Sequence, residues 1–165
     1  MNKPIVTFER PLLTDAPALL DVQVRSFHSD ADTYPGVALG GPPGYDSLDI
    51  VIEDIQEHLY TKIIHEGQIV GGFLVEDCGD GHFHLATLYI DPDYHNKGVG
   101  SQTMQFIEAT YPARLWTLDT PVYATRNQHF YEKFGYVKIG EKVFSDDVPL
   151  ITYQKTMAQP TSGLT

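Results

Sequence analysis

Apolar residues recur with helical spacing in two segments of the first sixty residues. The first segment begins after Thr14 and runs to about Phe27, and it predicts a helix whose apolar face includes Leu20 and Val24. The second begins at Asp46 or Ser47, either of which can cap a helix. Its apolar positions are spaced three and four residues apart and form one stripe, made of Leu48, Val51, Ile52, Ile55 and Leu59.

The rest of the chain alternates between strand-like and helix-like patterns separated by short turns. Strands are expected over Ile5–Glu9, Thr61–His65, Gln68–Glu76, His82–Ile90, Arg114–Leu118, Tyr136–Phe144 and Leu150–Met157. Further helices are expected over Lys97–Thr110 and Thr125–Phe134. The order βααβββαβαββ predicts an α/β protein with a mixed, largely antiparallel sheet. We expect one domain over residues 1–157 and a polar tail over residues 158–165.

Residues 29–46 form a long segment that is rich in Gly, Pro and Asp and has no periodicity. A loop of this length within a compact domain is usually functional or mobile. We therefore take Tyr34, Tyr45 and Asp46 as candidates that shape a substrate-binding site. A solvated loop without such a role is the alternative.

Charge and cysteine content narrow the classes of function. The chain of 165 residues has 22 acidic and 11 basic side chains, a formal net charge of −11. This charge argues against nucleic acid and an anionic membrane as partners. It suits a cationic substrate, although acidity also serves solubility alone. The chain has one cysteine, Cys78, and no long apolar leader. Both features predict a cytoplasmic protein.

The segment from Leu88 to Gln102 has the pattern of a strand, a glycine-containing turn and the start of a helix. A helix N-terminus presents unpaired N–H groups, and Gly98 and Gly100 let the backbone approach a phosphate. A P-loop would require the lysine after the glycine, and a dinucleotide fingerprint would require glycine where Thr103 stands. The segment is thus either an anion-binding loop of another kind or a tightly packed turn.

This segment and a later one together resemble the GNAT family of acyl-CoA-dependent N-acyltransferases. The first contains His95-Asn96-Lys97-Gly98-Val99-Gly100, which is similar to that family's Gln/Arg-x-x-Gly-x-Gly/Ala loop. The second, Phe130-Tyr131-Glu132-Lys133-Phe134-Gly135-Tyr136, is similar to its Phe-Tyr-Glu-Lys-x-Gly-Phe/Tyr signature. Two positions depart from the family pattern. His95 replaces Gln or Arg, and Ala124 stands where Asn is frequent, with Asn127 nearby.

The resemblance implies the GNAT fold and acetyl-CoA as the co-substrate. It also implies that Tyr131 lies near the CoA sulfur, where its hydroxyl would act as the general acid for the departing thiolate. Strand residues would pair with the pantetheine arm and loop residues would hold the pyrophosphate. The cofactor-binding candidates are Leu88, Tyr89, Ile90, His95, Asn96, Lys97, Gly98, Val99, Gly100, Ser101, Asn127 and Lys133.

His84 is the candidate general base. It lies on the strand that leads to the cofactor loop, at an offset where GNAT relatives often carry Glu. A neutral imidazole can accept the proton of an ammonium group, and His82 shares its strand face. Half-buried strand histidines without a proton role are the alternative. No third metal ligand is evident beside the His-x-His pair, so we expect no metal.

These features together predict an N-acetyltransferase that moves an acetyl group from acetyl-CoA to a primary amine. Direct attack within a ternary complex is the expected mechanism, and a small cationic amine is the favoured acceptor. A protein N-terminus or lysine is the alternative acceptor. A CoA-binding regulatory module without turnover is the alternative class. The assembly of two copies into a homodimer is left open.

Overall fold

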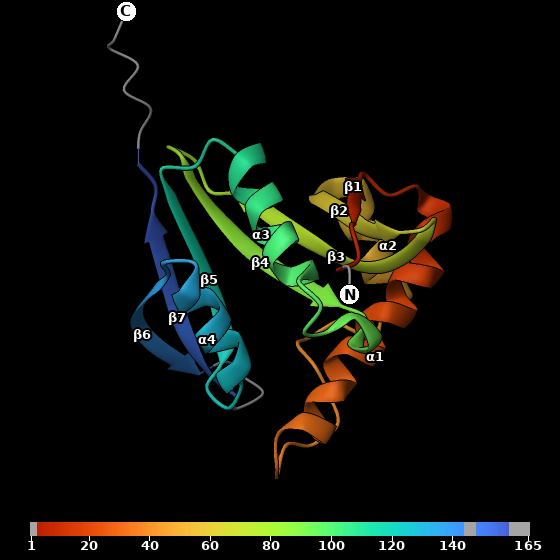
Figure 1. Cartoon of the computed structure of the whole chain (residues 1–165), viewed down its shortest axis with the longest axis horizontal. Coiled ribbons are helices and arrows are strands. Elements are labelled where there is room, and N and C mark those ends of the chain that lie inside the picture. Colours follow the sequence, from red (N-terminus) through yellow and green to blue (C-terminus); the bar gives the residue numbers. More distant parts are fainter. Residues whose placement is uncertain (1–2, 144–147, 159–165) are drawn as a thin grey trace, which may run out of the picture. The chain divides into compact units, whose positions relative to one another are not determined.

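The computed structural model describes residues 3–143 and 148–158, and its elements follow the predicted order βααβββαβαββ (Figure 1). Its α-helices are Ala16–Thr33 (α1), Leu48–Glu57 (α2), Val99–Thr110 (α3) and Thr125–Lys133 (α4). Short 3-10 turns lie at Leu13–Asp15 (η1) and Pro92–Tyr94 (η2). Its strands are Thr7–Glu9 (β1), Leu59–His65 (β2), Gln68–Asp77 (β3), His82–Ile90 (β4), Leu115–Pro121 (β5), Val137–Val143 (β6) and Pro149–Thr156 (β7). The predicted strand end at Phe144 and most of the predicted tail lie outside the described residues.

The strands form a mixed sheet in the order β1-β2-β3-β4-β5-β7-β6. β4 and β5 run parallel, whereas the pairs β1–β2, β2–β3, β5–β7 and β6–β7 are antiparallel. This confirms the predicted mixed sheet. The chain divides into two compact units, which are described separately below. Unit 1 is Met1–Val75 with Ala86–Thr110, and unit 2 is Glu76–Leu85 with Tyr111–Thr165. None of the helices in the described residues is long and apolar enough to cross a membrane.

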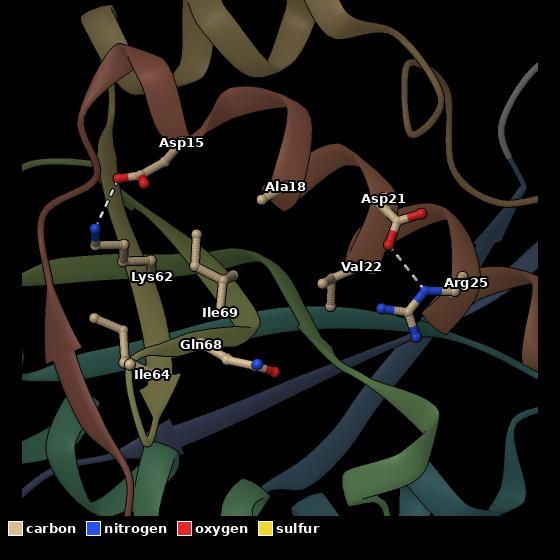
Figure 2. Close-up of a pocket in the computed structure, with 10 residues that line it drawn as sticks. Asp15, Ala18, Asp21, Val22, Arg25, Lys62, Ile64, Gln68 and Ile69 are labelled. Atoms are coloured by element: carbon tan, nitrogen blue, oxygen red, sulfur yellow. Dashed lines mark hydrogen bonds and ion pairs between the residues drawn. The ribbon is translucent and has the colours of Figure 1, made fainter.

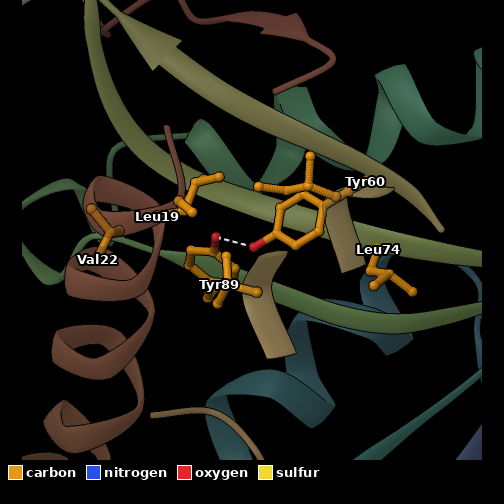
Figure 3. Close-up of a cluster of buried hydrophobic side chains, with 8 residues drawn as sticks. Leu19, Val22, Tyr60, Leu74 and Tyr89 are labelled. Carbon is orange, nitrogen blue, oxygen red and sulfur yellow. Dashed lines mark hydrogen bonds between the residues drawn. The ribbon is translucent and has the colours of Figure 1, made fainter. Parts of the chain in front are cut away.

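In unit 1, α1 and α2 pack against one face of the strands through an apolar cluster (Figure 3). The cluster consists of Ala16, Leu19, Val22, Val51, Ile55, Tyr60, Leu74 and Tyr89. Tyr60 and Tyr89 are the polar members, and their hydroxyl groups hydrogen-bond to each other in the core. Burial raises the pKa of both hydroxyls, so both stay neutral. The pair thus satisfies two polar atoms that would otherwise be buried without a partner.

α3 covers the other face of unit 1 through a set of aromatic rings. Phe106 of α3 stacks on Phe8 of β1 with ring centroids 4.2 Å apart, and both rings also contact Phe73 of β3. The side chain of Gln102 in α3 accepts a hydrogen bond from the Val6 N–H and donates one to a second backbone group of the same segment. These contacts fix the first two turns of α3 against the sheet.

Unit 2 is built around Trp116 of β5, which is fully buried and packs against Phe83 and Tyr111. Strand alternation places Leu118 and Thr120 on the same face as Trp116, and all three are buried. α4 covers this face. Thr117 and Asp119 consequently lie on the opposite face.

The first helix differs most from the sequence-based expectation. α1 continues to Thr33, well beyond Phe27. Residues Asp30 to Thr33 are helical although they have no apolar periodicity that would indicate a helix. α1 ends where Pro35 holds Tyr34 in an extended conformation. Its buried face also centres on Leu19 and Val22, rather than on Leu20 and Val24.

The second helix confirms one sequence-based expectation and corrects another. Its cap is Ser47, one of the two predicted alternatives, whose hydroxyl accepts the Ile50 N–H at 3.3 Å. Leu59 begins β2 and so does not extend the helical stripe, because α2 ends at Glu57. The predicted cap chemistry is confirmed, and the predicted last member of the stripe is wrong.

The tight contact between Gly71 and the Tyr89 backbone predicts a large stability effect for one methyl group. A Cβ at Gly71 would collide with the Tyr89 carbonyl oxygen and lie 3.1 Å from Ile63 Cδ1. We expect Gly71→Ala to lower the free energy of unfolding by roughly 1–3 kcal/mol, as overpacking does. Gly140→Ala on β6 is the control, since a Cβ there meets nothing within 4 Å. Urea unfolding of both variants tests this, and equal stability of the two would contradict it.

Candidate active site

The predicted cofactor loop in unit 1 follows β4 and leads into α3. Asn96 and Gly98 both adopt left-handed backbone conformations, with φ of 62° and 83°. Glycine reaches this region without strain, and asparagine tolerates it better than most residues. The two turns direct the chain into α3 at Val99, so the first N–H groups of the helix lack intrahelical acceptors. The helix dipole makes this end of α3 attractive to an anion.

Hydrogen bonds to neighbouring backbone groups hold this loop in place. Asp91 caps η2 by accepting the Asp93 N–H at 2.9 Å, and its own N–H donates to the Val70 carbonyl of β3. The His95 ring lies with Nε2 2.8 Å from the Ile90 carbonyl oxygen. Because a carbonyl only accepts, Nε2 of His95 carries a proton. His95, which replaces the family's Gln or Arg, thus closes the loop on the end of β4.

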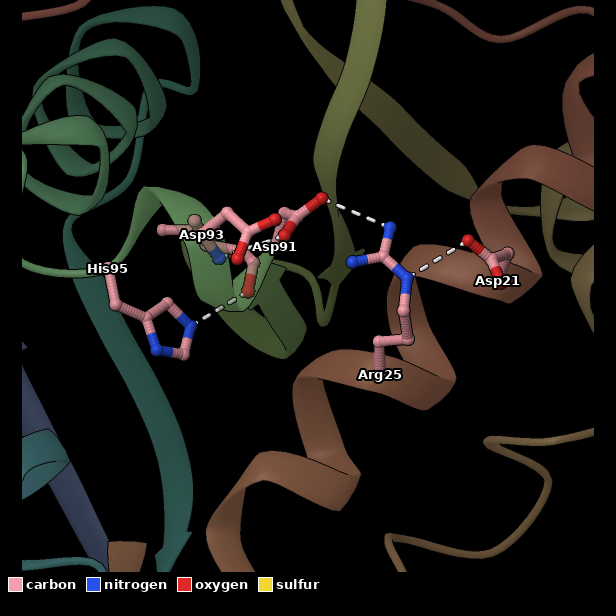
Figure 4. Close-up of polar contacts among 6 residues, drawn as sticks. Asp21, Arg25, Asp91, Asp93 and His95 are labelled. Carbon is pink, nitrogen blue, oxygen red and sulfur yellow. Dashed lines mark hydrogen bonds and ion pairs between the residues drawn. The ribbon is translucent and has the colours of Figure 1, made fainter. Parts of the chain in front are cut away.

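Arg25 of α1 connects the first helix to this loop (Figure 4). Its guanidinium donates to Asp91 Oδ2 and to Asp21 Oδ2, each at 3.0 Å. The Asp91 bond raises the pKa of Arg25 further above its ordinary value. Burial alone would raise the pKa of Asp91, but the Arg25 and Asp93 hydrogen bonds outweigh it and hold this pKa below the usual value. Asp91 therefore stays ionised and positions η2.

The remaining cofactor-binding candidates differ in exposure. Lys97 is exposed, and its ammonium group lies 5.7 Å from the centroid of the Tyr94 ring, whose hydroxyl contacts His65 Nδ1 at 3.0 Å. Gly100 and Ser101 lie in the first turn of α3. Tyr89 is fully buried by its ring contacts in the core, so only its backbone could contribute to a ligand site.

In unit 2, Tyr131 lies on α4 within a cluster of aromatic rings. Its ring centroid is 5.8 Å from that of Tyr136 and 6.3 Å from that of Tyr153. Tyr153 in turn donates its hydroxyl to Glu132 at 2.7 Å. Burial raises the pKa of Tyr131 well above its ordinary value, so its hydroxyl stays protonated at every physiological pH. Tyr131 is thus a permanent hydrogen-bond donor.

His84 lies on β4 beside two residues that sequence reasoning missed. Parallel pairing sets His84 opposite Thr117 of β5, and His84 Nδ1 is 2.7 Å from the Thr117 hydroxyl. His84 Nε2 is 3.8 Å from Asp119 Oδ2. Burial lowers the pKa of His84, and the carboxylates of Asp119 and Glu76 oppose this only in part. His84 is therefore neutral at physiological pH and is able to accept a proton.

Tyr131 and His84 lie on opposite faces of the unit 2 sheet. Asn127 of α4 donates to the Thr120 hydroxyl at 3.2 Å, which places α4 on the Trp116 face of β5. His84 instead bonds to Thr117, on the other face. The structure therefore puts a protonated phenol on one side of this sheet and a neutral imidazole on the other. Asn127 is engaged within the unit, and Lys133 is exposed at the end of α4.

Among the acceptor candidates of the long loop, Tyr45 has well-defined structural partners. Tyr45 packs edge-on against Phe27, and its hydroxyl lies 2.7 Å from His28 Nε2. Its carbonyl accepts a hydrogen bond from Gln23 of α1 at 2.8 Å. Tyr45 therefore anchors the loop to α1, whereas Asp46 is exposed and Tyr34 caps α1.

A hollow of about 380 Å³ opens between α1 and the β2–β3 hairpin (Figure 2). It is lined by Asp15, Ala18, Asp21, Val22, Arg25, Lys62, Ile64, Gly67, Gln68 and Ile69, which include none of the predicted site residues. Lys62 and Asp15 form an ion pair of 2.7 Å at one end, and Arg25 and Asp21 form another at the other end. Across residues 3–143 and 148–158, no three His, Cys, Asp or Glu side chains gather as metal ligands.

Comparison with known proteins identifies one family. Residues 56–138 match the family model of the acetyltransferase (GNAT) domain. The chain is 38% identical over 138 residues to the uncharacterized protein YrkN of Bacillus subtilis (strain 168), a match that covers 79% of this chain and 71% of that protein. It is 23% identical over 139 residues to S-(2-succino)cysteine N-acetyltransferase of the same organism, covering 78% and 82% respectively. In fold it is similar to the PaiA N-acetyltransferase of Thermoplasma acidophilum, solved in complex with coenzyme A, with a TM-score of 0.74, 15% identity, and coverage of 93% and 99%.

The Arg25–Asp91 pair predicts a stability difference that depends on pH. Arg25→Met should lower the free energy of unfolding at neutral pH by about 1 kcal/mol, because Asp91 is left with a largely buried charge. The pKa of Asp91 is lower in the folded than in the unfolded chain. The stabilisation is therefore complete above the unfolded pKa of about 3.9 and is lost as pH falls through the lowered folded pKa.

Urea unfolding of wild type and Arg25→Met at neutral pH and near the acid limit of stability measures this difference. We expect it to shrink on acidification. Arg10→Met removes the same charge from an exposed position and is the control. A difference that is the same at both pH values would show that Arg25 stabilises by packing alone.

Proposed function

Because the chain belongs to the GNAT family of acetyltransferases and is an acyltransferase, we propose that it transfers an acetyl group from acetyl-CoA to a primary amine. Both substrates bind before reaction, and the amine attacks the thioester directly. The observation that carries this proposal is the pair of groups on the two faces of unit 2. His84 is kept neutral on one face, and Tyr131 is kept protonated on the other.

The loop before α3 supports acetyl-CoA as the acetyl donor. The N–H groups of residues 98–101 and the exposed Lys97 suit a pyrophosphate, with His95 and Asn96 shaping the turn. Backbone groups of Leu88 to Ile90 would pair with the pantetheine arm. The Ile90 carbonyl already accepts His95, so that arm would rely on the other backbone groups. The structural relative that was solved with coenzyme A supports the same assignment.

The proposed chemistry moves one proton at each face. His84 accepts a proton from the ammonium form of the acceptor, whose pKa is near ~10.4 for a lysine-like amine. The freed nitrogen lone pair forms a bond to the thioester carbonyl carbon, and the carbon–sulfur bond breaks. The hydroxyl of Tyr131 gives its proton to the leaving thiolate as its charge develops. The nitrogen loses its second proton as the amide forms, and that proton balances the one taken up by the sulfur. The products are the N-acetyl amine and CoA.

A small cationic amine is the favoured acceptor. The net charge of −11 attracts cations, and Asp119 and Glu76 add negative charge near His84. An amino-acid α-amine is the second candidate, since one relative is named for acetylation of S-(2-succino)cysteine. Tyr34, Asp46 and the loop that Tyr45 anchors would shape the acceptor side. A protein N-terminus or lysine, and a CoA-binding role without turnover, remain as alternatives.

A panel of amines tests the proposal. Thiol release from acetyl-CoA is measured with polyamines, aminoglycosides, amino acids including S-(2-succino)cysteine, and peptides with free N-termini, ranked by kcat/KM. We expect a small cationic amine to rank first. A peptide in first place would favour the protein substrate. Acetyl-CoA binding without thiol release for any amine would favour the regulatory module.

Acetyl-CoA should raise the melting temperature of the protein. A ligand that binds only the native state stabilises it by about 2.7 kcal/mol at a concentration of 100 Kd. Gly100→Glu should abolish this shift, because it adds a side chain and a negative charge at the N-terminus of α3. Gly140→Glu adds the same charge on β6 and should retain the shift. No thermal shift of the wild type at millimolar acetyl-CoA would contradict the assignment of the donor.

Tyr131→Phe should lower kcat and leave acetyl-CoA affinity unchanged. The change removes a hydroxyl and keeps the ring contacts with Tyr136 and Tyr153. General acid catalysis is typically worth ~10²–10⁴-fold, and we expect a loss in this range. Tyr153→Phe removes a neighbouring hydroxyl, the one bonded to Glu132, and serves as the matched control. Full kcat in Tyr131→Phe, with chemistry rate-limiting, would make Tyr131 a packing residue.

A further inference from the structure

One hydroxyl group lies between two imidazole rings in unit 2. Thr117 Oγ1 is 2.7 Å from His82 Nε2 and 2.7 Å from His84 Nδ1. All three side chains lie on the same face of the parallel pair β4–β5, as the register of His82 and His84 against Leu115 and Thr117 requires. The hydroxyl has a single proton, so it can donate to only one of the two rings.

Both rings could also donate to the two lone pairs of Thr117, but its own proton would then have no ring acceptor. Two arrangements of protons for a neutral His84 place that proton on a ring nitrogen's lone pair. In one, Thr117 donates to His82 and accepts from the Nδ1–H of His84, which leaves Nε2 of His84 with a free lone pair. In the other, Thr117 accepts from the Nε2–H of His82 and donates to Nδ1 of His84, whose proton is then on Nε2. Only the first arrangement lets His84 accept a proton on Nε2, where Asp119 Oδ2 lies 3.8 Å away.

The charge on His82 selects between these arrangements. A protonated His82 carries a proton on Nε2 and can only donate to Thr117. Thr117 then turns its own proton toward His84 and fixes the form of His84 that is not a base. We propose that Thr117 is a positioning residue that transmits the protonation state of His82 to His84, so that His84 acts as a base only while His82 is neutral. This inference rests on the proposed function of His84.

Other charged groups also face the His84 ring and act on it through their charge. Asp119 of β5 and Glu76 of β3 favour its protonated form, whereas Lys142 of β6 and His82 itself disfavour it. Asp119 is also held by Lys142 Nζ at 3.0 Å and by the Thr152 hydroxyl at 2.7 Å. Its carboxylate is thus fixed in place to receive the Nε2–H of a protonated His84.

The relay predicts how activity depends on pH. Both histidines must be neutral, so log kcat/KM of the wild type should fall at low pH with a limiting slope of two. His82→Gln keeps a hydrogen-bonding partner for Thr117 but cannot be protonated, and its slope should fall to one. Thr117→Val should also give a slope of one. It should lower the high-pH plateau of kcat/KM roughly tenfold or more, because part of the contribution of the general base is lost. Thr117→Ser should restore the wild-type profile.

Nitrogen NMR of the histidine rings tests the relay without turnover. In the wild type, we expect the Nδ1–H form of His84 to disappear as His82 gains its proton, and in Thr117→Val we expect the two events to be independent. A form of His84 that stays the same across the titration of His82, or a coupling that survives in Thr117→Val, would overturn the relay. If no amine is acetylated but the NMR coupling is present, the relay stands and the proposed function fails. If an amine is acetylated but the NMR coupling is absent, the proposed function stands and the relay fails.

Discussion

The parallel pairing of β4 with β5 is the constraint on which the candidate chemistry depends. It sets Phe83 beside Trp116 on the buried face, and in the same register it sets His84 beside Thr117 on the other face. Because side chains alternate along a strand, a slip of one residue would exchange the two faces. The burial of Trp116 therefore also determines which side chains lie on the polar face. The separation of Tyr131 on α4 from His84 on β4 follows from this single register.

The acidity of the chain raises the question of how it could hold an anionic donor. Asp91 precedes the predicted cofactor loop, but the Arg25 guanidinium bonds to it and offsets its charge. Asp91 then serves as a cap for η2 instead of repelling an anion, while the N–H groups at the start of α3 and Lys97 remain at the loop itself. The net charge of −11 is thus compatible with the proposal that an anion binds at the start of α3.

The order of elements and the two motifs could be predicted because their signals are local. Helical spacing, turn residues and the left-handed glycine at position 98 all act within a few residues. The contacts between Arg25 and Asp91 and between His84 and Thr117 join residues 66 and 33 positions apart, and no pattern in the sequence indicates them. The polar end of α1 was missed for a related reason: it carries no apolar periodicity, and the helix ends only at Thr33, two residues before Pro35. Which partner holds each candidate side chain therefore required the structure.

The central claim is that Tyr131 and His84 serve one acyl transfer from opposite faces of the sheet. A crystal structure of the protein with bound acetyl-CoA tests it most directly. We predict the thioester sulfur within hydrogen-bond distance of the Tyr131 hydroxyl, about 2.6–3.5 Å between the heavy atoms, with the carbonyl carbon open to the face that carries His84. A thioester bound out of reach of Tyr131, or one whose carbonyl carbon is closed to the His84 face, would contradict the account.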